Sequence, residues 1–91
     1  AISSNGSNLQ QADILNNRGV EAYRKGNYNL AIYYYKQALN IKKRELGKRD
    51  LSLATTYNNL GLAYKRANNF KKALYCILAS LKIREGILGK K

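Results

Sequence analysis

The 91-residue chain contains no histidine, methionine, tryptophan or proline, and its single cysteine is Cys76. Without histidine it cannot form a His-dependent catalytic triad or a histidine metal site, and one cysteine cannot build a zinc site or an internal disulfide. We therefore expect a non-enzymatic protein with no catalytic residues, no metal and no other cofactor. A lone cysteine fits a reducing compartment, so we also expect a cytoplasmic, intracellular location.

Acidic residues are scarce, since five Asp and Glu stand against 17 Lys and Arg and give a net charge of +12. Such an excess indicates an acidic partner, whether a peptide, a nucleic acid or an anionic membrane surface. Long apolar runs are lacking as well. The longest uncharged one covers residues 73–81, far short of the roughly 20 residues that span a bilayer. We expect no membrane span.

What the chain does have is an internal repeat, because much of residues 15–39 recurs 42 residues later at 56–81. A fixed period of about 20 to 50 residues is typical of repeat architectures. We divide the chain into a flexible lead-in at residues 1–7, a first repeat with its connector at 8–49, and a second repeat at 50–91. Among the identical pairs, Asn16/Asn58, Asn17/Asn59 and Arg24/Arg66 lie on the helices but outside the expected core stripe.

The absence of proline and the abundance of Ala, Leu, Lys and Arg favour long helices. We predict helices at about residues 8–25, 28–45 and 70–86, and another from a cap at Asp50 or Ser52 to residue 67. Ser7 and Gln10 form a plausible capping box for the first helix. Residues 26–27 and 68–69 supply turns, because Gly and Asn tolerate the left-handed backbone that ends a helix.

Helical spacing predicts which side chains face the core. The expected inward residues are Leu15, Gly19 and Ala22, interrupted by Arg18; Ala31, Ile32, Tyr35, Ala38, Leu39 and Ile41; Leu53, Tyr57, Leu60, Gly61 and Tyr64; and Ala73, Leu74, Ile77, Leu78 and Leu81. Gly in mid-helix costs about 1 kcal/mol against Ala, so we expect Gly19 and Gly61 to permit close approach of the next helix at Ala31 and Ala73. The predicted fold is all-α, with two antiparallel helical hairpins stacked side by side.

The pattern Asn-Leu-Gly-x-Ala-Tyr, then a polar turn, an aromatic residue and Ala-Leu, resembles the tetratricopeptide repeat over residues 11–91. The matching residues are Gly19, Gly26, Tyr28, Ala31, Tyr35 and Ala38 in the first copy, and Leu60, Gly61, Tyr64, Phe70, Ala73 and Leu81 in the second. The 42-residue period and the phrases TTYNNLGLAYKRANNFKKAL and LKIREGILG are similar to the longer variety found in kinesin light chains. The resemblance implies a protein-binding adaptor or scaffold.

Three features depart from this family's pattern. Arg18 and Ala22 replace the usual Leu and Tyr in the first repeat. Residues 48–50 read Lys-Arg-Asp where His-Pro-Asp often joins such long repeats. The chain has two repeats, whereas at least three are normally needed for a stable array.

The resemblance also implies that the first helix of each hairpin lines a concave groove. Residues away from the core stripe on these helices are the expected peptide-binding set: Asn16, Asn17, Val20, Tyr23, Arg24, Asn58, Asn59, Leu62, Lys65 and Arg66. Asn can hold a peptide backbone by donating and accepting, and Arg offers a fork that suits a carboxylate. Alternatively, the repeated Asn and Arg residues are shared through descent from one duplicated copy.

The kind of partner follows from these residues. Some family members grip a C-terminal carboxylate with Lys, Asn and Arg. Asn59 matches that clamp, but Asn16 and Val20 stand where its Lys and Asn are expected. An internal acidic segment with a large apolar side chain suits this groove better. The alternatives are a nucleic-acid-binding helical repeat that uses the basic surface and a purely structural, self-associating module.

Two further clusters have simpler interpretations. The Tyr33-Tyr34-Tyr35 run invites base stacking, but three consecutive residues on a helix point in different directions, so we expect Tyr35 in the core and the other two partly buried. The basic clusters at residues 42–44, 48–49 and 71–72 are expected to be solvated faces, and Cys76 is expected to pack as a small hydrophobic residue.

The predicted last helix carries more apolar residues than one preceding hairpin can cover. Large apolar patches on soluble proteins usually mark interfaces. Either the chain is part of a longer array or copies of it form a homo-oligomer through this edge. The expected edge residues are Leu74, Ile77, Leu78, Leu81, Ile87 and Leu88, with Tyr75 beside them.

Overall fold

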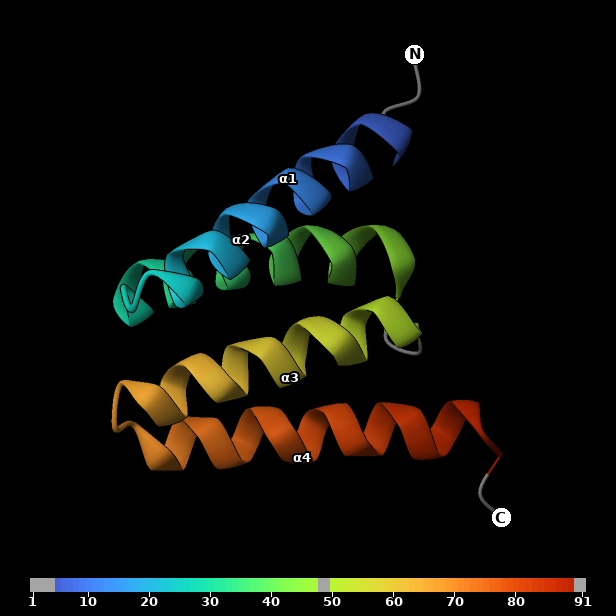
Figure 1. The fold of residues 1–91 in the computed structure, drawn as a ribbon. Coiled ribbons are helices and arrows are strands. Elements are labelled where there is room, and N and C mark those ends of the chain that lie inside the picture. Colours follow the sequence, from blue (N-terminus) through green and yellow to red (C-terminus); the bar gives the residue numbers. More distant parts are fainter. Residues whose placement is uncertain (1–4, 48–49, 90–91) are drawn as a thin grey trace.

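A computed structural model of the chain describes residues 5–47 and 50–89. Within these residues the chain forms four helices: α1 (Asn5–Arg24), α2 (Tyr28–Leu46), α3 (Leu51–Arg66) and α4 (Phe70–Ile87). Each helix runs back along the preceding one, and the four follow one another in chain order across the molecule (Figure 1). The all-α prediction of two stacked antiparallel hairpins is confirmed.

The turns within the two hairpins have the chemistry expected from the sequence. Gly26 has φ 82° and Asn68 has φ 66°, the left-handed conformation that reverses the chain after a helix. Asn27 and Asn69 then cap α2 and α4, each accepting a hydrogen bond of 3.3 Å from the backbone N–H three residues further on. The 42-residue repeat is therefore preserved down to the cap geometry.

The start of α1 differs from the prediction. The helix begins at Asn5, so Ser7 lies inside it instead of capping it, and residues 5–7 of the expected lead-in are helical. The early turns are held by α2, because Asn8 Nδ2 donates to Glu45 Oε2 at 2.8 Å. Residues 1–4 of the lead-in, 48–49 of the connector and 90–91 at the end lie outside the described residues.

Helix α3 forms the centre of the molecule, because α2 packs on one side of it and α4 on the other. Asp50 caps it, accepting a hydrogen bond of 2.8 Å from the Ser52 N–H. The predicted α3 stripe is confirmed, since Leu53, Tyr57, Leu60, Gly61 and Tyr64 are all buried. Because α3 has a helix on each side, few of its residues are exposed. Those that are exposed lie on the two open faces of the molecule.

The two mid-helix glycines make room for different neighbours. A Cβ at Gly61 would lie 3.2 Å from the Ala73 carbonyl oxygen and 2.9 Å from Ile77 Cγ1, which confirms the close approach of α4. A Cβ at Gly19 would instead meet the Tyr35 ring at 2.6 Å. Close approach of α2 at Gly19 is therefore confirmed, with Tyr35 as the nearest residue. The first repeat has Tyr35 where the second has the smaller Ile77.

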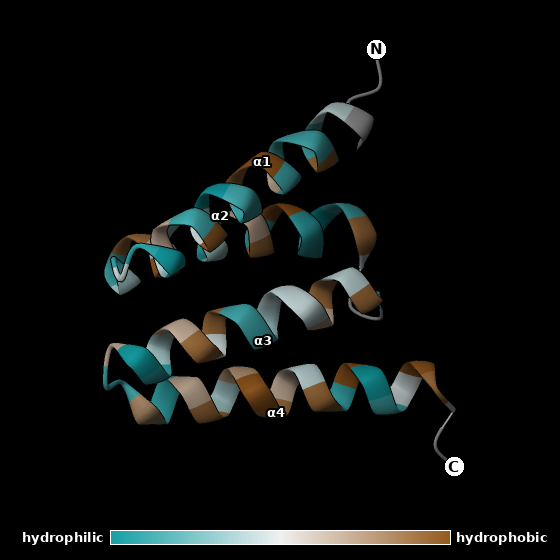
Figure 2. Ribbon diagram, viewed as in Figure 1, coloured by the Kyte–Doolittle hydropathy of each residue, from teal (hydrophilic) through white to brown (hydrophobic). Residues whose placement is uncertain are grey.

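The inward face of α4 is also different from the one predicted. Ala73, Cys76 and Ser80 are its buried residues, and Cys76 packs as the expected small hydrophobic residue at 3% exposure. Leu74, Ile77, Leu78 and Leu81, predicted to face inward, are exposed. Close approach of α4 to α3 places mainly small side chains in the interface, with Ile77 against Gly61, while Leu74, Leu78 and Leu81 turn outward. Figure 2 shows hydrophobic residues recurring along the whole of α4.

The other two helices bury mainly their small residues. Ala12, Gly19 and Ala22 are the buried positions of α1, whereas Leu15 is only half-buried. In α2 the predicted core residues Ala31, Tyr35, Ala38 and Leu39 are buried, and Ile32 and Ile41 are half-buried. The Tyr33–Tyr35 prediction is confirmed for the core position of Tyr35 and the half-buried Tyr34. It is wrong for Tyr33, which is 56% exposed.

Candidate functional site

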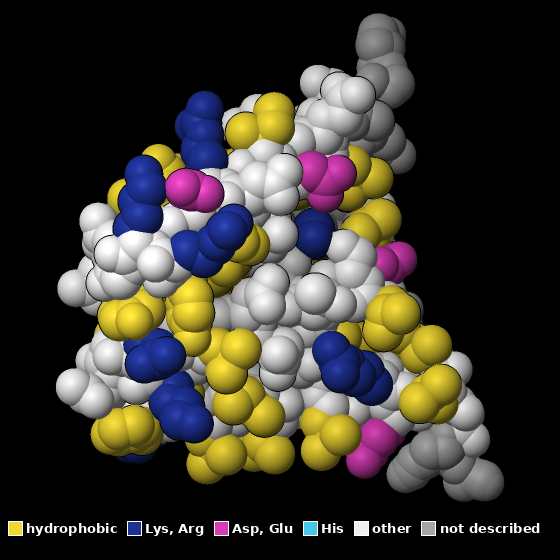
Figure 3. Space-filling view, in the orientation of Figure 1, with side chains coloured by type: hydrophobic (Ala, Val, Ile, Leu, Met, Phe, Trp, Pro, Cys, Tyr) yellow, Lys and Arg dark blue, Asp and Glu magenta, His cyan; other side chains and the backbone are white. Residues whose placement is uncertain are grey.

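The face formed by α1 and α3 contains two adjoining hollows, which together we call the concave groove. One of about 170 Å³ is lined by Val20, Tyr23, Tyr35, Asn59 and Leu62. The other, of about 530 Å³, is lined by Tyr23, Leu62, Lys65, Arg66, Asn68 and Phe70. Tyr23 and Leu62 belong to both. Hydrophobic and basic side chains lie next to one another on this face (Figure 3).

The structure brings together part of the predicted peptide-binding set. The predicted residues that line the concave groove are Val20, Tyr23, Asn59, Leu62, Lys65 and Arg66. Asn16 and Asn58 are half-buried outside it, and Asn17 and Arg24 are exposed outside it. Asn16 Oδ1 is buried without a hydrogen-bond partner among the described residues, so it cannot accept a hydrogen bond from a ligand in the groove.

Arg66 connects the second repeat to the first. Its Nε donates to the Tyr23 hydroxyl at 3.4 Å, and its guanidinium carbon lies 5.7 Å from the centre of the Tyr28 ring. Tyr23 and Tyr28 meet edge to face, with ring centroids 5.3 Å apart. The hydrogen bond to Tyr23, with a smaller contribution from Tyr28, raises the pKa of Arg66. Arg66 therefore contacts the neighbouring repeat, a role that the sequence did not predict.

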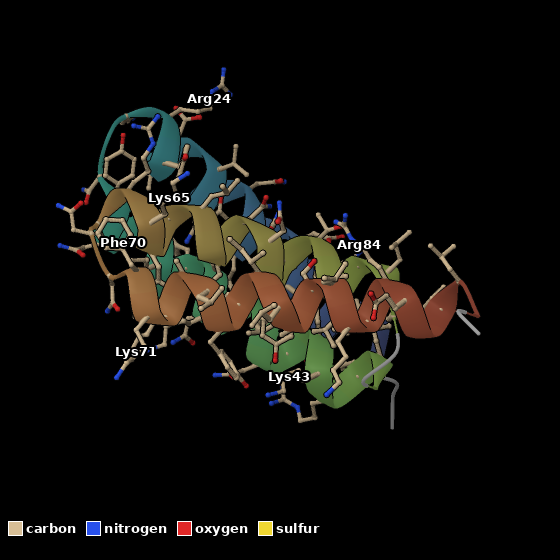
Figure 4. The ribbon with its side chains drawn as sticks, turned by 90° about the horizontal axis from the view of Figure 1, so that it is seen from below. Arg24, Lys43, Lys65, Phe70, Lys71 and Arg84 are labelled. Atoms are coloured by element: carbon tan, nitrogen blue, oxygen red, sulfur yellow. The ribbon has the colours of Figure 1, made fainter. Side chains whose placement is uncertain are left out.

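Arg24 is the equivalent residue of the first repeat and has a different environment. It is exposed and points away from the helices on the side where Lys65 lies (Figure 4). The two arginines therefore do not form a matched pair of carboxylate forks. Of the predicted basic residues, Lys65 and Arg66 are exposed and line the groove, and Arg66 is the one that also contacts Tyr23.

The opposite face carries a second groove that the sequence analysis did not predict. Its two hollows, of about 460 and 280 Å³, lie between α2 and α4 with α3 as their floor, and they share Lys43, Tyr57 and Tyr75. In Figure 4, Lys43 lies on the side of the molecule away from Arg24 and Lys65. The available signal was the spacing of Lys36 and Lys43, which are seven residues apart and so share one side of a helix.

Lys42 is buried between α2 and α3, although its cluster was interpreted as a solvated face. It is 6% exposed, and its Nζ donates to Thr56 Oγ1 at 3.0 Å. The Thr56 hydroxyl in turn donates to the Ser52 carbonyl at 3.2 Å. Burial lowers the pKa of Lys42, and the charges of Asp13 and Asp50 partly oppose this effect. The prediction for Lys42 is therefore wrong, while Lys43 and Arg44 are exposed.

The described residues contain no group of three side chains that could hold a metal ion, and none of their helices is long and apolar enough to cross a membrane. The sequence model of the tetratricopeptide repeat family matches residues 10–86, and the chain belongs to this family. Its members generally mediate protein–protein interactions as non-enzymatic modules. A comparison with curated proteins found no match.

Proposed function

We propose that the chain is an adaptor module whose concave groove binds an acidic protein segment carrying a large apolar side chain. The observation that supports this most is the arrangement of Val20 and Leu62 in the groove, with Asn59 and Lys65 beside them. Leu62 is exposed although it lies on the central helix. An apolar side chain of a partner would remove it from water, which is favourable by about 25 cal/mol per Å² of apolar area.

The polar residues of the groove suit an acidic segment. Asn59 can both donate to and accept from a peptide backbone, and the exposed Lys65 can pair with a carboxylate. Arg66 uses one N–H on Tyr23, which leaves the other donors of its guanidinium for a ligand. These groups give the proposed ligand its charge and its backbone contacts, while Leu62 and Val20 provide the apolar contact.

A random-peptide library displayed on phage tests this proposal. We expect the selected peptides to be acidic and to contain an aromatic or large aliphatic residue. Lys65→Glu should weaken their binding about tenfold, whereas Lys71→Glu, an exposed lysine of α4 outside the groove, should change it by less than about twofold. If the selected peptides bind Lys65→Glu as tightly as the wild type, the groove assignment is wrong.

We also assign the chain to the longer variety of the repeat that resembles kinesin light chains, supported by its 42-residue period. The single buried cysteine supports an intracellular, cytoplasmic location.

Self-association through α4 is a second candidate function. Leu74, Leu78, Leu81 and Leu88 are between 50% and 82% exposed, and Ile77 and Ile87 are exposed beside them. Hydrophobic side chains line the lower edge of the molecule over α4 in Figure 3. In the described residues no further element covers this edge, and a second copy of the chain can bury it.

A further inference from the structure

The groove between α2 and α4 has four lysines in its walls, and we call it the lysine groove. Lys36 and Lys43 come from α2, and Lys72 and Lys82 come from α4. All four side chains are exposed. Within the described residues, none of the four forms an ion pair and the lining contains no Asp or Glu. Lysines on both walls of a cleft produce a positive potential that attracts an anionic ligand.

The lysine groove is more basic than the concave groove. The concave groove is lined by Lys65 and Arg66, and Arg66 is already bound to Tyr23. The lysines of the other face have no comparable partners except Lys72, whose Nζ lies 5.7 Å from the centre of the Tyr64 ring. Four of the chain's 17 basic residues therefore line this groove.

The lysine groove also offers apolar surface. Its floor residues, Leu53, Tyr57 and Leu60, are buried, so the accessible apolar surface lies mainly in the α4 wall, where Tyr75 has 67% of its surface exposed. Ile83 is half-buried in the same wall. A ligand that only carried negative charge would leave this surface uncovered, so the lining fits a ligand with both carboxylates and large apolar side chains.

The aromatic residues argue against a nucleic acid as the preferred ligand. Strands of nucleic acid bind by stacking successive bases on exposed rings. Tyr57 and Tyr64 are each 8% exposed, so their faces are not accessible to bases. Among the described lining residues, Tyr75 is the one aromatic ring open to a ligand. One open ring is too few for a series of stacked bases.

We propose that the lysine groove is a second binding site, separate from the concave groove, for an acidic protein segment. Apolar side chains of the segment contact Tyr75 and Ile83, and its carboxylates pair with Lys43, Lys72 and Lys82. Lys72 and Lys82 are ten residues apart, which corresponds to about 15 Å along α4. This length accommodates about three turns of an amphipathic helix, which binds grooves through apolar residues at i, i+3, i+4 and i+7.

The test uses a fluorescein-labelled peptide with leucine at that helical spacing and glutamate elsewhere, followed by fluorescence anisotropy at about 0.15 M salt. We expect Lys43→Glu with Lys82→Glu to weaken binding by about tenfold or more. The matched control is Arg18→Glu with Lys25→Glu, which changes two exposed basic residues, one in α1 and one in the turn after it, by the same charge. This control should change the affinity by less than about twofold.

Two variants that leave the net charge unchanged distinguish direct contact in the groove from general electrostatic attraction to the basic protein. Tyr75→Ala removes the exposed ring and should weaken binding of the same peptide about tenfold. Tyr33→Ala is its control, because Tyr33 is the equivalent residue of the first repeat, is also exposed, and lies outside the groove lining. Unchanged helical circular dichroism confirms that each variant is folded.

Several results would overturn the inference. Equal losses from the Arg18/Lys25 pair and the Lys43/Lys82 pair would show that the peptide responds only to net charge. Loss of binding in Lys65→Glu, with the Lys43/Lys82 pair unaffected, would place the peptide in the concave groove and support the proposed function instead. An oligothymidylate of equal charge that binds more tightly than the peptide, and depends on Lys43, would make the site a nucleic-acid groove. Absence of measurable peptide binding would also refute the proposed site in the lysine groove.

Discussion

At the scale of single residues, the buried Lys42 is the least expected feature of the molecule. Its ammonium group has one hydrogen bond, to Thr56, where a buried charge normally has a carboxylate partner. Removing such a charge from water is costly unless several polar groups replace the water. We infer that Lys42 destabilises the fold relative to an apolar side chain of the same length.

Lys42→Met tests this inference. The substitution keeps the length of the side chain and removes the charge, and Thr56 retains its hydrogen bond to Ser52. We expect the free energy of unfolding to rise by about 1 kcal/mol, which raises the melting temperature by roughly 4–8 °C in a domain of this size. Thermal unfolding followed by circular dichroism measures the change. A lower melting temperature would mean that the ammonium group stabilises the contact between α2 and α3.

The effect of this variant should depend on pH. The pKa of Lys42 is lower in the folded state than its ordinary value of 10.5, so the unfolded state binds the proton more tightly. Stability of the wild type therefore gains from Lys42 as the pH rises from the lowered pKa towards 10.5. The advantage of Lys42→Met should be full at neutral pH and shrink over that window. An advantage that stays constant up to pH 10.5 would contradict the lowered pKa.

In both the wild type and Lys42→Met, buried tyrosines make the stability fall as the pH rises, which is opposite to the effect of Lys42. Burial raises the pKa of Tyr35, Tyr57 and Tyr64 above 10.0. Their contribution to stability is complete below pH 10 and is lost as the pH rises through their folded-state pKa values. Because wild type and Lys42→Met share these tyrosines, the difference between the two proteins isolates Lys42.

At the scale of the helices, most of the architecture could be predicted from the sequence. The turns follow from Gly26, Asn27, Asn68 and Asn69, and the α3 stripe follows from helical spacing. The orientation of α4 could not be predicted in this way, because large apolar residues cover most of its circumference. The positions of the small residues determine which face of α4 packs against α3. Their effect depends on the distance between the two helices, which cannot be predicted from the sequence.

The candidate site could also be predicted only in part from the sequence. Helical geometry correctly placed Asn59, Leu62 and Lys65 in one groove, because these residues lie on one helix face. It could not reveal the contact of Arg66 with Tyr23, since the two are 43 residues apart and meet only when the repeats stack. Nor did it reveal the lysine groove, whose walls belong to helices that are not consecutive in the chain.

Close packing of α3 on α4 gives a prediction at this scale. In Gly61→Ala the new Cβ would lie 2.9 Å from Ile77 Cγ1 and 3.2 Å from the Ala73 carbonyl oxygen, so the Ile77 side chain and the α4 backbone must both shift by a few tenths of an ångström. Alanine gains about 1 kcal/mol of helix propensity, and overpacking costs about 1–3 kcal/mol. We expect a net fall of about 1 kcal/mol in the free energy of unfolding, measured by urea denaturation. A more stable variant would show that the two helices are not in such close contact.

At the scale of the whole molecule, the exposed side of α4 predicts association of the isolated chain. Light scattering coupled to size-exclusion chromatography should show a mass above that of the monomer, increasing with concentration. Leu78→Glu places a charge in the middle of the exposed edge and should return the protein to a monomer without loss of helix content. A wild-type protein that stays monomeric and folded at high concentration would contradict self-association.

The two faces differ in the ligands that they can take. Both combine basic residues with apolar surface, but the concave groove offers Asn59 and Lys65 around Leu62, whereas the lysine groove offers four lysines around Tyr75. The molecule is thin, with Cα extents of 40 × 36 × 16 Å. Both grooves are lined by residues of α3, so the two proposed sites for acidic segments share one helix.

The most direct measurement of the proposed function is an amide chemical-shift map of the chain titrated with a peptide selected from the phage library. The account predicts that the largest shifts cluster at the concave groove, around Val20, Asn59, Leu62 and Lys65. Shifts confined to α2 and α4, or spread evenly over the basic residues of the surface, would contradict the assignment of the concave groove as the adaptor's binding site.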